Sequence, residues 1–310
     1  MKDFLRRGTR FKPLALLPLL LLSGCNWALV DPKGPIGVEE KHLTLYVLAA
    51  LLVFVVGPVV LATLAFAWHF RAGNTKAKYR PDFQHSIIIE IFSWSGPCVI
   101  VAILGVVTWD TTHQLDPYKP LPAMANVQPV DVDVVALDWK WLFIYPKEHI
   151  ASVNEMAMPV GTPINFRITS ATVMNAFFIP QLGTQIYAMG GMQTQVHLLA
   201  DHPGTYRGIS ANFSGDGFSG MVFHAIAMDQ AGFKAWVQKV RQSSQVLNRQ
   251  TYAELAKPTE YVKPMFYGAV QGNIFQDQIA SFMGPKMSMS DTKIDATHAA
   301  SKGASGSSGM

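Results

Sequence analysis

Cysteine and charge are scarce in this sequence. Its 310 residues include only two cysteines, Cys25 and Cys98, which excludes a disulfide framework and a zinc site built from several thiolates. Charged residues make up 15% of the chain and hydrophobic residues 49%, whereas soluble domains carry about 25% charge. This composition excludes a disordered protein and argues against an ordinary cytosolic enzyme.

The charge that is present argues against nucleic acid as a partner. The formal net charge of +4 is small, and the basic residues are dispersed rather than gathered into the patch or stripe that nucleic-acid binders show. The length allows about two domains, so the positions of the apolar residues decide the architecture.

Residues 1–24 have the pattern of a lipoprotein signal peptide. A basic N-terminus precedes a leucine-rich run from Pro13 to Leu22, which is too short to cross a bilayer because a span needs about 20 helical residues. The following Ser23-Gly24-Cys25 completes a resemblance to the bacterial lipobox, in which the cysteine is diacylated after cleavage. We therefore expect a lipid such as palmitate on Cys25; the alternative is an incidental cysteine after an ordinary signal.

Two apolar segments predict transmembrane helices at 43–69 and 87–110. The first has no charged residue from Leu43 to Trp68, and its Gly57-Pro58 pair predicts a kink of the kind that membrane helices tolerate. The second is interrupted by a single acid, Glu90.

The charge of the loop between these segments predicts the topology. Residues 70–86 are rich in Lys and Arg, which places this loop in the cytoplasm by the positive-inside rule. The segment 25–42 and everything after the second helix are then on the periplasmic side of a bacterial inner membrane.

The exported part changes to the periodicity of β-strands. Apolar and polar residues alternate in several short runs that are separated by Gly, Pro and Asn turns, which predicts an all-β, antiparallel sandwich or barrel over 111–230. A helical region is expected at 231–284, with one apolar face formed by Phe233, Trp236, Val237 and Val240. The Ser/Gly/Ala/Met-rich residues 285–310 are expected to be a disordered tail.

Side chains for catalysis or metal binding are missing from the exported part. No thiol follows Cys98, and Ser214–Gly220 matches neither a nucleophile elbow nor a phosphate loop. The histidines are scattered without metal-ligand spacing, and the tail methionines are better explained by low-complexity sequence than by a weak copper site. We therefore predict no catalytic residue and no metal in this chain.

Five stretches of the sequence are nearly identical to those of one known family, and in the same order. They are Cys25–Gly37, Asp138–Pro146, Val173–Pro180, Gln185–Met189 and Ser214–Met221. The chain thus resembles subunit II of the haem-copper respiratory oxidases, in the quinol-oxidising cytochrome bo branch, over about residues 25–282. The resemblance implies a membrane-anchored protein with a two-helix hairpin, then an all-β cupredoxin-like sandwich and a short C-terminal helical region.

Relatives that oxidise cytochrome c hold a dinuclear copper centre in this sandwich. Their ligands are an upstream His and the motif Cys-x-Glu-x-Cys-x₃-His-x₂-Met, because copper of this kind needs soft sulfur and imidazole. Only the methionine is retained at the matching positions of this chain, which are Asn175, Ser210, Asn212, Ser214, Phe218 and Met221. The resemblance therefore implies a sandwich without copper that takes no electrons from cytochrome c.

Within the family, the electrons come from quinol in the membrane. A large catalytic subunit I holds the haems, one copper and the quinol site, and further small membrane subunits complete the oxidase. The resemblance implies that this chain binds no cofactor of its own and is a non-redox scaffold and periplasmic cap in a proton-pumping ubiquinol oxidase that reduces O₂ to water. The aromatic stretch Asp138–Trp141 is then expected to serve docking and packing.

Glu90 is the one residue for which we predict a mechanistic role. A carboxylate at the centre of a membrane helix costs roughly 2.5–3.5 kcal/mol, and such residues usually face protein or water; Glu90 lies near the cytoplasmic end. The resemblance implies a role in proton uptake, because subunit II of the family contributes a glutamate here to the K-type proton channel. The alternative is an interfacial acid that reaches the lipid headgroups.

Two other functions remain open at this point. An exported lipoprotein with a binding module, such as a copper carrier that uses the Met-rich tail, would purify alone with bound copper. A cytochrome c oxidase subunit with a working copper centre conflicts with Ser210 and Ser214, since a hydroxyl cannot replace a bridging thiolate.

Overall fold

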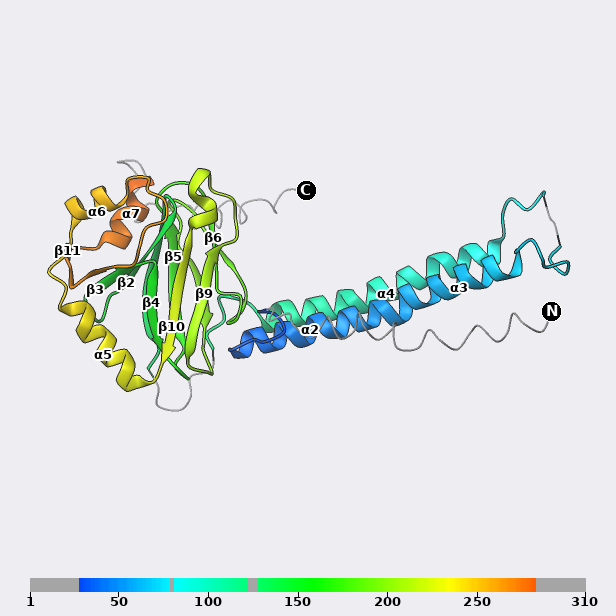
Figure 1. Cartoon of the computed structure of the whole chain (residues 1–310), viewed down its shortest axis with the longest axis horizontal. Coiled ribbons are helices and arrows are strands. Elements are labelled where there is room, and N and C mark those ends of the chain that lie inside the picture. Colours follow the sequence, from blue (N-terminus) through cyan, green and yellow to red (C-terminus); the bar gives the residue numbers. More distant parts are fainter. Residues whose placement is uncertain (1–27, 79–80, 122–127, 283–310) are drawn as a thin grey trace, which may run out of the picture.

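The computed structural model describes residues 28–78, 81–121 and 128–282, which form a two-helix hairpin and a β-sandwich (Figure 1). The predicted signal peptide, Cys25 and the predicted tail 285–310 lie outside these residues. The hairpin projects from one side of the sandwich, and the C-terminal helices lie on the side away from it.

The first long helix begins earlier than the apolar segment predicted. It consists of α2 (Pro35–Leu51), a π-helical turn η2 (Leu52–Val56) and α3 (Gly57–His69), whereas a start at 43 was expected. Pro35 occupies the first helical position, where its missing N–H costs no hydrogen bond. Helical hydrogen bonds form with polar side chains as well as apolar ones, so the hydropathy pattern marks the membrane-embedded part and not the end of the helix.

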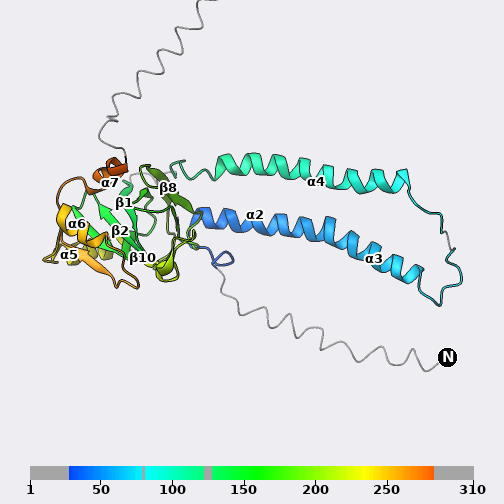
Figure 2. The same cartoon turned by 90° about the horizontal axis from the view of Figure 1, so that it is seen from above.

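A π-helical turn immediately precedes the Gly57-Pro58 pair. Gly57 donates its N–H to Leu52 O, one residue further back than in an α-helix. Pro58 has no N–H to continue the regular ladder, and π-turns and prolines are common causes of helix bending. Figure 2 shows the bend between α2 and α3, as the sequence predicted.

The second long helix, α4 (Ile87–Gln114), starts at the predicted residue and ends later than the predicted 110. Its last turn is polar, and Gln114 Nε2 donates to Asp110 Oδ2 at 2.7 Å, which extends the helix past the apolar segment. Both long helices are apolar and long enough to cross a membrane.

Two sheets pack face to face to form the sandwich. The first has the order β12-β3-β2-β1-β5-β8 and the second the order β4-β10-β9-β6-β7. The strands of the first sheet are β1 (Val130–Leu137), β2 (Lys140–Tyr145), β3 (Ile150–Val153), β5 (Ile164–Ser170), β8 (Thr194–Leu198) and β12 (Met265–Tyr267). Those of the second are β4 (Glu155–Pro159), β6 (Asn175–Phe178), β7 (Ile186–Ala188), β9 (Gly204–Ser210) and β10 (Val222–Met228).

The sheets are mixed, so the expectation of a wholly antiparallel sandwich was wrong. β1 pairs with β5 in parallel, and β10 pairs with β4 in parallel. Alternation of apolar and polar residues predicts which face of a strand is buried, but it carries no information about the direction of the neighbouring strand. Between the sheets lies an aromatic core in which Phe223 stacks on Phe177 with ring centroids 5.2 Å apart.

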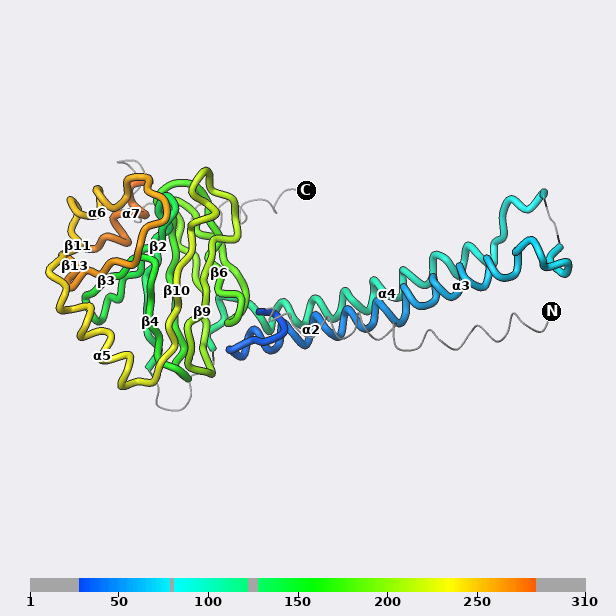
Figure 3. Tube along the Cα trace, in the orientation of Figure 1, coloured from blue at the N-terminus to red at the C-terminus, as the bar shows by residue number. Residues whose placement is uncertain are grey.

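The C-terminal region is only partly helical, which corrects the expectation for 231–284. It contains α5 (Gln230–Arg241), α6 (Arg249–Leu255) and α7 (Ile274–Phe282), but also β12 and the short pair β11 (Val246–Leu247) and β13 (Ala269–Val270). β12 pairs with the free edge of β3 and so extends the first sheet. The predicted apolar face of α5 is confirmed, because Phe233, Trp236, Val237 and Val240 are buried. Figure 3 shows this region gathered on the flank of the sandwich.

Backbone hydrogen bonds join the start of the hairpin to the sandwich. Lys33 N donates to Gln181 O at 2.7 Å, Gly37 N donates to Leu182 O at 3.2 Å and Lys33 O accepts from Asp201 N at 2.8 Å. Gly34 lies between these contacts, and a Cβ on it would collide with the carbonyl oxygen of Leu199. The hairpin is therefore attached through main-chain contacts that only a glycine permits.

Candidate functional site

The structure brings the six residues at the family's copper-ligand positions to one end of the sandwich. Asn175 opens β6, Ser210 closes β9, and the others lie on the loop that leads through a 3₁₀ turn, η3 (Asp216–Gly220), into β10. We call this set the Ser210 cluster; it consists of Asn175, Ser210, Asn212, Ser214, Phe218 and Met221. Positions 35 residues apart in the sequence, Asn175 and Ser210, are in direct contact.

Hydrogen bonds within the chain connect the polar members of the Ser210 cluster. Ser210 Oγ donates to Asn175 Oδ1 at 3.0 Å, and the Asn175 amide donates to Val173 O at 3.1 Å. Asn212 Nδ2 donates to Met174 O at 3.0 Å, which ties the loop after β9 to the loop before β6. Asn175 and Ser210 are 1% and 5% exposed, so these bonds satisfy groups that water does not reach.

The donor set of the Ser210 cluster does not fit a copper pair. It offers hydroxyl, amide and phenyl groups and one thioether, with Ser214 Oγ 3.9 Å from Met221 Sδ. Copper sites of this kind are built from thiolate and imidazole, and the cluster contains neither. Over the described parts of the chain, no three His, Cys, Asp or Glu side chains are grouped so that they could hold a metal ion.

Trp139 covers the loop of the Ser210 cluster. It lies in the tight turn between β1 and β2 with φ of 63°, a conformation that bulky residues rarely adopt. Its indole Nε1 donates to Ser214 O at 3.0 Å, and its ring lies where side chains on Gly215 and Gly217 would stand. These contacts hold the strained turn and the loop against each other.

Lys140 ties the C-terminal region to the same end of the sandwich. It is 1% exposed, and its Nζ donates to Lys257 O at 2.8 Å and Thr259 Oγ1 at 2.5 Å. Burial lowers the pKa of Lys140, although Asp138 opposes the shift. No sequence pattern predicts this contact, because its partners are 117 and 119 residues away.

The second tryptophan of the aromatic stretch has a different position. Trp141 is fully buried and packs edge-on against Phe177, with ring centroids 5.4 Å apart. The expectation of a docking role is therefore wrong for Trp141, because strand alternation sends it into the core, and the packing role is the correct part of that expectation.

Glu90 lies in the first turn of α4, far along the chain and the structure from the Ser210 cluster. Its Oε1 is 3.8 Å from Nε2 of His85, and its side chain is 55% exposed. The surrounding side chains of the helix are apolar and exposed as well, for example Ile87, Ile91 and Phe92. A carboxylate on such a surface needs water or another protein beside it.

Comparisons with known proteins agree on one family. Residues 125–228 match the model of the cytochrome c oxidase subunit II periplasmic domain, and residues 241–286 match the COX aromatic-rich motif. The cytochrome bo(3) ubiquinol oxidase subunit 2 of Pseudomonas aeruginosa is 54% identical over 264 residues, covering 85% of this chain and 79% of that protein. The ubiquinol oxidase subunit 2 of Acetobacter aceti is 53% identical, covering 85% of each chain.

A solved structure is similar at lower identity. It is the periplasmic domain of subunit II of cytochrome oxidase from Bradyrhizobium japonicum, with 24% identity and a TM-score of 0.34, covering 36% of this chain and 91% of that one.

Proposed function

Because this chain belongs to the family of subunit 2 of the bo3-type ubiquinol oxidases, a branch of the haem-copper oxidases, we propose that it is the metal-free scaffold subunit of such an oxidase. The donor set of the Ser210 cluster carries this proposal. Asn175, Ser210 and Ser214 stand where a copper pair would need imidazole and thiolate, and their polar groups are already hydrogen-bonded to the chain.

A domain without copper does not relay electrons from cytochrome c. Electrons then come from quinol bound by the partner, the large catalytic subunit I, which supplies the haems and the remaining copper for the reduction of O₂ to water. This chain contributes packing: the hairpin packs on that subunit, and further small membrane subunits complete the complex. The exposed apolar side chains along both long helices support this role, among them Phe54, Leu61 and Trp94.

The same proposal fixes the orientation in a bacterial inner membrane. The Lys- and Arg-rich loop between α3 and α4 is cytoplasmic by the positive-inside rule. The sandwich and the start of α2 are then periplasmic, with the N-terminus anchored by lipid on Cys25.

Glu90 then stands at the cytoplasmic end of its helix. We assign it to proton uptake for a proton-pumping reaction in the catalytic subunit. Its exposure on an apolar helix surface supports this assignment, since a membrane carboxylate persists where protein or water solvates it.

Metal analysis of the purified oxidase tests the central claim. The complex should contain the copper of the catalytic subunit alone and should oxidise ubiquinol but not reduced cytochrome c. A matched variant supplies the positive control: Asn175→His, Ser210→Cys, Asn212→Glu, Ser214→Cys and Phe218→His together restore the family's ligands and should add a dinuclear copper centre with its thiolate absorption. Extra copper in the unmodified complex would overturn the proposal.

A further inference from the structure

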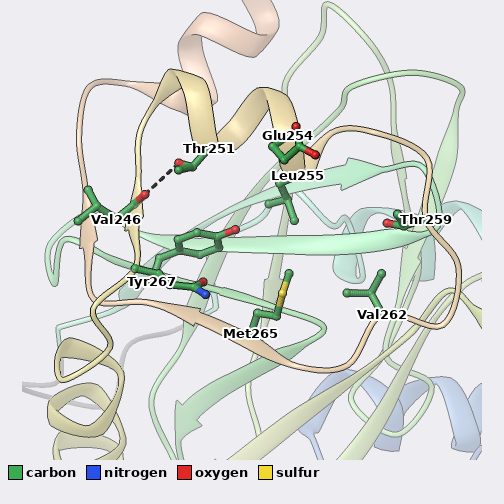
Figure 4. A pocket seen from close by; sticks show the side chains of 9 residues that line it. Val246, Thr251, Glu254, Leu255, Thr259, Val262, Met265 and Tyr267 are labelled. Atoms are coloured by element: carbon green, nitrogen blue, oxygen red, sulfur yellow. Dashed lines mark hydrogen bonds between the residues drawn. The ribbon is translucent and has the colours of Figure 1, made fainter.

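A separate cavity of about 550 Å³ opens in the C-terminal region. Figure 4 shows its lining, which comes from β11, α6, β12 and the segment between α6 and β12. Its walls are mainly apolar and are formed by Val246, Leu255, Val262 and Met265. The volume is within the range of small-molecule sites, roughly 300–1,000 Å³.

Polar groups of Gln245, Thr251, Glu254, Thr259 and Tyr267 complete the lining, and the Tyr267 hydroxyl lies between the apolar side chains. Tyr267 is 6% exposed, and Figure 4 shows its hydroxyl directed between Leu255, Met265 and Val262. This hydroxyl makes no hydrogen bond to any of the described residues, whereas Tyr145 and Tyr252 do. The hydroxyl therefore faces the solvent of the open cavity, and a ligand there can replace water as its hydrogen-bond partner.

The charges at the cavity select against an anion. None of the side chains that line it is cationic, and Glu254 is the one acid among them. The nearby Lys257 Nζ is paired with Glu254 at 2.5 Å, and Lys140 Nζ is committed to Lys257 O and Thr259 Oγ1. A negatively charged ligand would therefore meet a carboxylate and no ammonium group among the lining side chains.

We propose that this cavity binds a small neutral molecule that is mainly apolar and carries one carbonyl oxygen, which accepts a hydrogen bond from the Tyr267 hydroxyl. Apolar contact with the walls supplies most of the affinity, and the hydroxyl fixes the orientation of the ligand. The site is independent of the proposed function of the chain and lies apart from the Ser210 cluster.

One segment of the chain lines the cavity and also packs against the loop of the Ser210 cluster. Thr259 and Val262 line the cavity, while Glu260 and Tyr261 of the same segment pack against Gly217 and Gly220 of the cluster's loop. A ligand that orders residues 257–262 therefore also restricts the motion of Glu260 and Tyr261, which pack on this loop.

Binding can be measured by fluorine NMR on the purified oxidase with three probes of one size. para-Fluoroacetophenone has the carbonyl, para-fluoroethylbenzene lacks it and para-fluorobenzoate is an anion. The ketone should bind saturably, the hydrocarbon more weakly and the benzoate not at all. Val262→Phe fills the cavity and should abolish saturable binding, which separates it from partition into detergent. Hydrogen exchange of residues 257–262 should slow when the ketone is bound.

Two tyrosine variants isolate the hydrogen bond. Tyr267→Phe should lower the affinity for the ketone by about two- to tenfold, the equivalent of one hydrogen bond. The affinity for the hydrocarbon should not change. Tyr261→Phe removes a hydroxyl from an exposed tyrosine outside the cavity and should change neither. Absence of saturable binding, binding that survives Val262→Phe, or equal ketone affinity in Tyr267→Phe and the unmodified protein would overturn the proposal.

Discussion

Polar side chains have different surroundings in the sandwich and in the membrane hairpin. In the sandwich, Ser210 and Lys140 pair within the chain: Ser210 bonds to Asn175, and Lys140 bonds to the segment 257–259. In the hairpin, Glu90 stays exposed, with His85 Nε2 3.8 Å from its carboxylate. The difference shows that Ser210 and Lys140 find their partners within the chain, whereas the carboxylate of Glu90 needs water or another protein beside it.

The junction between the two regions should give the largest effect. Gly34→Ala keeps an allowed backbone conformation, since φ is −146°, but its Cβ collides with Leu199 O. We expect the contacts between the start of α2 and the sandwich to lose about 3 kcal/mol of stabilising free energy. Hydrogen exchange at the amides of Lys33, Gly37 and Asp201 should then be faster. Gly73→Ala, where no atom lies within 4 Å, is the control; equal behaviour of the two variants would show that the junction is loose.

Lys140→Met tests whether the sandwich depends on its internal pairing. Loss of the bonds to Lys257 and Thr259 should cost about 2 kcal/mol, less than the sum of two charged hydrogen bonds because the cost of burying the charge is also removed. We expect a lower thermal unfolding midpoint and faster exchange in the segment 257–259.

The same variant has a pH signature. Burial lowers the pKa of Lys140 in the folded chain, so between this lowered pKa and about pH 10.4, the ordinary lysine value, unfolding takes up a proton. The contribution of Lys140 to stability therefore rises with pH in the window between the lowered pKa and that value. The stability difference between the unmodified protein and Lys140→Met should grow across this window, and a constant difference would contradict the assignment.

Glu90→Gln tests the dependence of the hairpin on its partner. Turnover of the assembled oxidase should fall about tenfold, equivalent to roughly 1.4 kcal/mol in the barrier, while subunit composition and thermal unfolding stay the same. Asp110→Asn, which removes an acid from the opposite end of α4, should leave turnover unchanged. Normal turnover in Glu90→Gln would eliminate the proton-uptake role.

Ser210→Ala should have the smallest effect of the set. It leaves Asn175 Oδ1 without its donor, which should cost about 1 kcal/mol of unfolding free energy, and it should not change quinol oxidation. Ser219→Ala, at an exposed serine, is the control for stability. A marked loss of turnover in Ser210→Ala alone would show that the cluster takes part in the reaction.

Much of the architecture was accessible from the sequence because it depends on local patterns. Apolar runs predicted both long helices, and the spacing of Phe233, Trp236, Val237 and Val240 predicted the buried face of α5. Helix ends were less accurate, since α2 and α4 extend into polar residues that helical hydrogen bonds accept equally well. The parallel pairing of β1 with β5 was missed because alternation does not encode strand direction.

The sequence by itself determined which atoms are present at the site. Serine at 210 and 214 and asparagine at 175 exclude thiolate and imidazole from those positions wherever they lie in space. Tertiary structure alone decided that these positions meet, that Lys140 reaches Thr259 across 119 residues of chain, and that the Tyr267 hydroxyl faces a cavity without a partner. The functional groups at the site follow from the residue types alone. Their proximity depends on burial and on strand pairing over long sequence distances, which local sequence patterns do not encode.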